Sequence, residues 1–118
     1  MFETKLATEA AFSENQDRAA IIEHSNGLLL VIADGVGGMA GGREAAELAI
    51  QLVKVSAVAS EHFMNPFAYS NFLIEADNML FAHPLAGETT AIVVAVSDDL
   101  VCGASVGDSG AFLIQDQS

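Results

Sequence analysis

An unbroken apolar run at residues 28–33 ends at Asp34, and five glycines follow within the next eight residues. Six apolar residues without a polar face indicate a strand in the interior of a sheet. Beyond Arg43 the apolar side chains recur at helical spacing, so the glycine-rich segment has to join this strand to a helix. The sequence therefore places Asp34 at the end of a buried strand, where its carboxylate projects into a loop.

The segment before this run predicts its antiparallel partner. Residues 19–23 are apolar except for Glu23, with Ile21 and Ile22 at their centre. Asn26-Gly27 follows, and this dipeptide is a strong signal for a tight turn between two strands. We therefore expect a hairpin in which residues 28–33 form the second strand.

Two helices are predicted after the hairpin. The first begins at Arg43 and carries apolar residues on more than one side as far as Val55, so it should be largely buried. The second begins at Asn65-Pro66, because asparagine is a favoured cap and proline a favoured first helical residue. It is expected to end near Phe81, just before His83-Pro84.

The last third of the chain returns to the pattern of strands. Three strands are predicted at residues 90–96, 100–106 and 111–114, with turns at 97–99 and 107–110. Helices that are segregated from antiparallel hairpins favour an α+β fold, with a layered antiparallel sheet and two antiparallel helices, over an alternating βαβ fold.

The charge balance narrows the classes of function. The chain has 118 residues, with 16 acidic and 4 basic side chains, a formal net charge of −12 and 52% hydrophobic residues. So acidic a surface repels nucleic acid and anionic membranes, whereas it attracts cations. No apolar run approaches the roughly 20 residues of a membrane span. The first ten residues also lack a signal-peptide pattern, so we expect a cytoplasmic protein that binds neither nucleic acid nor membrane.

Three aspartates are predicted at the ends of strands. Asp17 precedes the first strand, Asp34 follows the second, and Asp108 lies in the turn at 107–110. A carboxylate beside an accessible glycine carbonyl, as at Asp34-Gly35, offers the oxygen ligands that a hard divalent cation prefers. Each aspartate alone could equally be a solvated charge, a cap or an ordinary turn residue. The three aspartates, in this order and with this spacing along the chain, form a pattern of carboxylates at strand ends.

That pattern is carried by four segments: ENQDR at 14–18, VIADGVGGMAGGREAAELA at 31–49, GETTAIVVAV at 87–96 and VGDSGAFLI at 106–114. In order and separation they resemble the motifs of the PP2C family of Mn/Mg-dependent protein serine/threonine phosphatases. The D-G-x-G-G block combined with G-D-S is specific, and the resemblance extends over nearly the whole chain. It implies a partial α-β-β-α sandwich, which agrees with the predicted α+β class.

The resemblance also implies a metal centre. Asp17 matches the aspartate of the first motif, Asp34 the aspartate that bridges two metals, and Gly35 the residue whose main-chain carbonyl is a ligand. Asp108 matches the G-D-S aspartate that is associated with a third metal in several members. In the family, two Mn²⁺ or Mg²⁺ ions hold and acidify a water that attacks the phosphorus of a phosphoserine or phosphothreonine in a phosphoprotein. Asp34 is thus the expected catalytic residue, and all four positions are expected metal ligands.

Four residues depart from the family pattern. Phe12 stands where many members have an arginine that clamps the phosphate, and a phenyl ring offers no hydrogen-bond donors. Gln16 replaces a common acid, Val36 replaces a histidine that bacterial-like members often lack, and Gly110 replaces the arginine of G-D-S-R. These departures put the binding of the phosphate in question more than the fold.

Two arginines are candidates for the lost phosphate contact. Arg18 or Arg43 could substitute for the missing arginine, or each could be an ordinary surface or helix-end residue. Because the family domain is longer than this chain, we expect residues 1–118 to form a single partial domain, with the later strands and metal ligands beyond Ser118. Self-association or a partner is then expected to cover the sheet surface that those strands would occupy.

Three functions remain open from the sequence. The first is a metal-dependent phosphatase. The second is a catalytically impaired fragment or pseudophosphatase that acts as a binding or regulatory module, which Phe12 and Gln16 favour. The third is a nucleotide-binding module, because residues 35–40 fit G-x-G-x-x-A between a strand and a helix. Asp34 opposes this third function, since its charge would lie beside the pyrophosphate.

Overall fold

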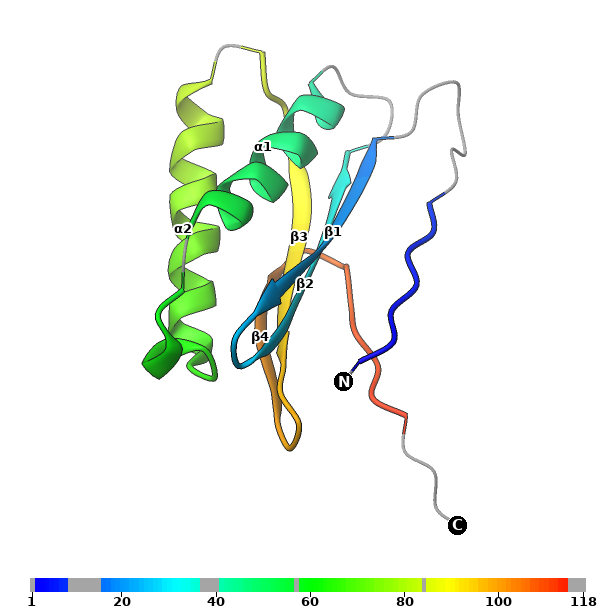
Figure 1. The fold of residues 1–118 in the computed structure, drawn as a ribbon. Helices are drawn as coiled ribbons and strands as arrows, with labels where there is room; N and C mark the ends of the chain where they lie inside the picture. Colours follow the sequence, from blue (N-terminus) through cyan, green and yellow to red (C-terminus); the bar gives the residue numbers. More distant parts are fainter. Residues whose placement is uncertain (1, 9–15, 37–40, 57, 84, 115–118) are drawn as a thin grey trace.

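The computed structural model describes residues 2–8, 16–36, 41–56, 58–83 and 85–114. In chain order, its elements are β1 (Asp17–His24), β2 (Gly27–Gly35), α1 (Gly42–Val55), a 3₁₀ turn (Ser60–His62), α2 (Pro66–Ala82), β3 (Thr89–Val96) and β4 (Val101–Val106). The four strands form one antiparallel sheet in the order β1-β2-β3-β4, and both helices cover the same face of it (Figure 1). The predicted α+β fold with an antiparallel sheet and two helices is confirmed.

The helix ends follow from their capping residues. Asn65 begins α2, because its side-chain oxygen accepts a hydrogen bond of 3.0 Å from the backbone N–H of Phe67, and Pro66 takes the first helical position. Gly41 precedes α1 with a φ of +86°, a left-handed conformation that glycine adopts without strain. The predicted starts of both helices are therefore close to the observed ones.

The core lies between the sheet and the two helices. Alternate residues of β2 and β3 are buried on this face, and the register places Leu29 opposite Ala95 and Val31 opposite Val93. Ala46, Ala49 and Val53 of α1 belong to the same cluster. Small side chains on α1 let the helix approach the sheet closely, and Gly42 at its start lies against Gly35 at the end of β2.

Tyr69 is the largest fully buried side chain in this core, and its hydroxyl donates a 2.5 Å hydrogen bond to the carbonyl of Phe63. Burial raises the pKa of Tyr69 to about 12. Tyr69→Phe should keep the packing but leave the carbonyl oxygen without this donor, so the free energy of unfolding should fall by about 1–2 kcal/mol. Urea unfolding of the two proteins measures the difference, and an unchanged midpoint would show that the bond contributes nothing.

The β1–β2 hairpin is also attached to the segment between the helices. The His24 ring stacks on Phe63 with 4.5 Å between ring centroids. Its Nδ1 accepts a hydrogen bond from the backbone N–H of Asn26, so Nε2 carries the proton and donates to the carbonyl of Val58 at 3.0 Å. These contacts fix the turn end of the hairpin, at the opposite end of the strands from Asp34.

The second face of the sheet is open and largely apolar. Leu30 and Ile32 of β2 lie on it, paired with Val94 and Ile92 of β3, and Ile32 is exposed. The N-terminal segment, residues 2–8, runs along this side of the molecule (Figure 1), and its residues 3–7 border a hollow together with Leu30 and Ile32.

The prediction of a strand at residues 111–114 is wrong. The chain is irregular from 107 to 114, and Phe112 and Ile114 are 94% and 90% exposed. Gly107, with a φ of +94°, turns the chain away from β4 and toward the open side of the sheet, where the segment has no strand to pair with (Figure 1). Apolar alternation indicates a strand only where a neighbour supplies the hydrogen bonds.

Candidate metal centre

Asp17 and Asp34 face each other across neighbouring strands. Asp17 is the first residue of β1, and the antiparallel register places it directly opposite Asp34, the penultimate residue of β2. Residues paired in this way share one face of the sheet, with their Cβ atoms roughly 5 Å apart. The register of a short hairpin thus places two carboxylates together on the open face at one end of the sheet.

The pairing alters the acidity of Asp34. A hydrogen bond with the side chain of Asp17, then burial, and then the charges of Asp17 and Asp108 raise the pKa of Asp34 to about 6. The carboxylate pair therefore holds a proton well above the usual range of an aspartate. A cation at the same position would relieve the same repulsion.

Asp108 reaches this region through the turn after β4. Gly107 approaches Thr90 so closely that an added Cβ would lie 2.5 Å from the Thr90 methyl group. The Thr90 and Ser109 hydroxyls form a 2.7 Å hydrogen bond, and the Thr90 hydroxyl donates a longer bond of 3.5 Å to the carbonyl of Asp34. Because a hydroxyl has one proton, Ser109 is the donor to Thr90. Thr90 thus joins the turn that carries Asp108 to the end of β2.

Gly35 lies where the end of β2 meets the start of α1. Its backbone N–H donates to the carbonyl of Gln16 at 3.1 Å, and the N–H of Val36 donates to the carbonyl of Glu88 at 3.0 Å. A Cβ on Gly35 would lie 2.3 Å from the carbonyl oxygen of Gly42. Only glycine allows this approach, which brings the N-terminus of α1 to the end of β2 that carries Asp34.

Gln16 supplies a further polar atom at this end of the sheet. Its side-chain Oε1 is buried and has no hydrogen-bond partner within the described part of the chain. It lies next to Gly42, where an added Cβ would be 2.8 Å from it. Gly42 begins the helix that covers the core face, so this oxygen lies on the opposite face of the sheet from the side chains of Asp17 and Asp34.

Thr90 and Ser109 have no role that the sequence alone predicts. Both lie within segments that resemble the family motifs, at 87–96 and 106–114, but only the folded chain brings their hydroxyls together. The two candidate arginines are engaged in ion pairs on α1: Arg18 with Glu47 and Arg43 with Glu44, each at 3.0 Å. Phe12 lies outside the described residues.

The three aspartates gather at one end of the sheet without forming a compact cage. Among the described residues, no three acidic, histidine or cysteine side chains lie close enough together to hold a metal ion. The charge of Asp108, the last and smallest of the causes that raise the pKa of Asp34, acts over longer distances than a metal–oxygen bond. Asp17 and Asp34 are therefore the close pair, and Asp108 is a more distant charge.

A comparison with protein families identifies the family of the chain. A family model described as protein phosphatase 2C matches residues 9–118. The chain belongs to the protein phosphatase 2C family. A comparison with curated proteins gives no match.

A solved structure supports the phosphatase 2C fold. The serine/threonine phosphatase Stp1 from Staphylococcus aureus matches with a TM-score of 0.67 and 21% sequence identity. The match covers 86% of this chain and 44% of the Stp1 chain, so the present chain spans less than half of that structure. Within its described residues, this phosphatase 2C chain has no helix that is long and apolar enough to cross a membrane.

Proposed function

We propose that this chain takes part in the metal-dependent hydrolysis of phosphoserine and phosphothreonine in proteins. The observation that supports the proposal most strongly is the pairing of Asp17 with Asp34 across β1 and β2. Two adjacent carboxylates, one of which has a raised pKa, form a site whose charge favours Mn²⁺ or Mg²⁺ over a neutral ligand. When bound, such ions supply an activated water and neutralise the phosphate charge.

We propose a separate role for each residue of this site. Asp17 and Asp34 would hold the cation, with Asp34 as the catalytic residue and the main chain of Gly35 as a further oxygen ligand. Asp108 would attract a cation from a greater distance. Thr90 and Ser109 act as positioning residues, because their hydrogen bond keeps the Asp108 turn beside the end of β2.

The experiment is Mn²⁺-dependent hydrolysis of p-nitrophenyl phosphate and of a phosphothreonine peptide. The unaltered chain should show turnover that depends on metal, and Asp34→Ala should lower it at least about 100-fold. Asp98→Ala is the matched control, since Asp98 is an exposed aspartate in the β3–β4 turn, at the other end of the sheet. Absence of turnover at every metal concentration would reject the enzymatic function for this chain.

A second candidate function is a catalytically impaired relative that binds a partner. One observation favours it: Arg18 and Arg43, the candidates for the lost phosphate contact, are held in ion pairs with glutamates of α1. In that case the open apolar face of the sheet would take the partner. Binding of Mn²⁺ without turnover would distinguish this candidate from the phosphatase.

A further inference from the structure

Helix α2 carries a stripe of large apolar side chains on its outer surface. Phe67, Ile74 and Phe81 are 75%, 59% and 96% exposed, and they follow one another at intervals of seven residues. Seven residues make nearly two helical turns, so the three side chains lie along one line of the helix. The opposite side of α2 is the one that packs on the core, through Tyr69 and Ala76. The helix is thus apolar on a side that no described residue covers.

The stripe is symmetric about the middle of the helix. Ile74 is the central residue of α2 (Pro66–Ala82), and Phe67 and Phe81 lie seven residues to either side of it. A two-fold axis at Ile74 would stack Ile74 on the Ile74 of a second copy. It would also stack Phe67 of each copy on Phe81 of the other. Self-complementary spacing of this kind is what an isologous interface requires. We infer that α2 is the interface of a two-fold homodimer in which the two helices pack antiparallel.

The polar residues beside the stripe fit the same symmetry. The axis brings Asn71 beside Asn78 and Ser70 beside Asp77 of the second copy, because residues seven apart lie on the same flank of the helix. An Asn amide can donate to an Asn oxygen, and a Ser hydroxyl to an Asp carboxylate, so each pair can place a donor against an acceptor.

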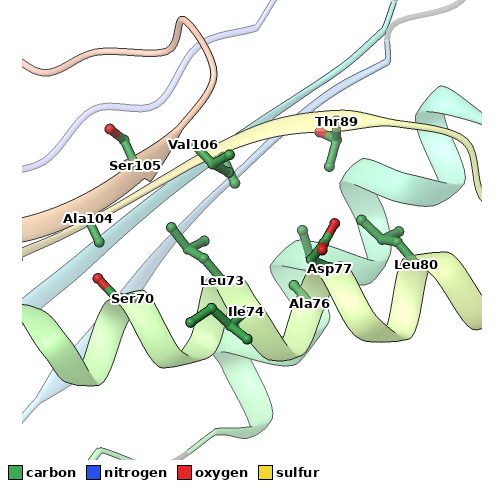
Figure 2. Close-up of a pocket in the computed structure, with 12 residues that line it drawn as sticks. Ser70, Leu73, Ile74, Ala76, Asp77, Leu80, Thr89, Ala104, Ser105 and Val106 are labelled. Atoms are coloured by element: carbon green, nitrogen blue, oxygen red, sulfur yellow. The ribbon is translucent and has the colours of Figure 1, made fainter.

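The surface beside the stripe has room for a facing helix. Figure 2 shows Ser70, Ile74 and Asp77 bordering a hollow of about 400 Å³ between α2 and the ends of β3 and β4. Val106 and Leu73 line the hollow, and its walls are mainly apolar. Side chains of a second α2 could enter this space.

The contact area and the charge set the expected strength of the dimer. An aromatic side chain buries about 150–250 Å². Four phenylalanines and two isoleucines would therefore bury about 1,000 Å², near the lower limit for a specific interface. Each copy also has a net charge of −12, so the two copies repel each other at low salt. We therefore expect a reversible dimer that strengthens as the salt concentration rises.

Sedimentation equilibrium over a range of protein and salt concentrations tests the dimer. Phe81→Ser and Ile74→Asp should each weaken dimerisation at least about tenfold. Phe112→Ser is the matched control, because Phe112 is equally exposed but lies in the C-terminal segment. A monomer at all concentrations, or a dimer that Phe112→Ser weakens and Phe81→Ser does not, would overturn the proposal.

Cysteine cross-linking tests the antiparallel geometry. In a Cys102→Ser background, Ile74→Cys alone should form a disulfide dimer under mild oxidation. Phe67→Cys and Phe81→Cys should each form no disulfide dimer alone, and they should cross-link with each other when mixed. Efficient self-linking of Phe67→Cys would instead indicate parallel helices and would contradict the proposed interface. Circular dichroism of each variant checks that the fold is kept, as expected for exposed positions.

Discussion

Gly35→Ala is expected to lower the free energy of unfolding by about 3 kcal/mol. The added methyl group would lie 2.3 Å from the carbonyl oxygen of Gly42 and 2.9 Å from that of Gln16. Both are backbone atoms, so neither can rotate away, and the end of β2 and the start of α1 would have to separate. Urea unfolding followed by circular dichroism gives the free energy and the cooperativity of each protein.

Gly110→Ala is the matched control for this variant. No described atom lies within 4 Å of an added Cβ at Gly110, so its stability should change by no more than about 0.5 kcal/mol. Equal effects of the two substitutions would show that the close approach of β2 to α1 does not determine stability.

Asp34→Asn is expected to stabilise the metal-free protein at neutral pH. The pKa of Asp34 is about 6 in the folded chain, against an ordinary value of 3.8. Between these values the folded chain holds a proton that the unfolded chain has released, so stability falls as pH rises from about 4 to 6. An amide does not ionise, so the stability of Asp34→Asn should not fall over this pH range.

The expected size of this gain is limited by solvent. A shift of this size corresponds to roughly 3 kcal/mol in a fully buried site, but Asp34 is exposed and solvent screens the repulsion. We expect about 1 kcal/mol, or a rise in Tm of about 4 °C at pH 7, which vanishes near pH 4. Thermal unfolding at both pH values measures it, with Asp98→Asn as the control. A gain of equal size at pH 4 would mean that repulsion between the carboxylates is not its cause.

Local signals in the sequence were sufficient for most of the fold. Asn26-Gly27 predicted the β1–β2 hairpin, and Asn65-Pro66 predicted the start of α2, because each signal acts through the backbone of neighbouring residues. The apolar run at 28–33 became the centre of β2, flanked on both sides by other strands. These features depend little on the rest of the chain.

Features that depend on distant contacts were not predictable in the same way. The pattern at 111–114 is that of a strand, but a strand also requires a neighbour, and the sequence of the segment does not specify one. The hydrogen bond between Thr90 and Ser109 joins residues 19 positions apart. Its existence depends on how β3, β4 and the turn at Gly107 fold together.

The candidate site falls between these two cases. The register that places Asp17 opposite Asp34 follows from a tight turn at Asn26-Gly27, so the pair is a local consequence of the sequence. The position of Asp108 depends on the packing of the late turn against Thr90, which only the folded chain reveals. The ligand roles of these three residues and of Gly35 stay predictions.

Titration with Mn²⁺, followed by the loss of the free-ion electron paramagnetic resonance signal, tests the metal site most directly. The account predicts that Asp17→Asn and Asp34→Asn each weaken Mn²⁺ binding at least about tenfold. Asp108→Asn should weaken it less, and Asp98→Asn should leave it unchanged. Equal Mn²⁺ affinity of the unaltered chain and Asp34→Asn would contradict a metal site at the paired ends of β1 and β2.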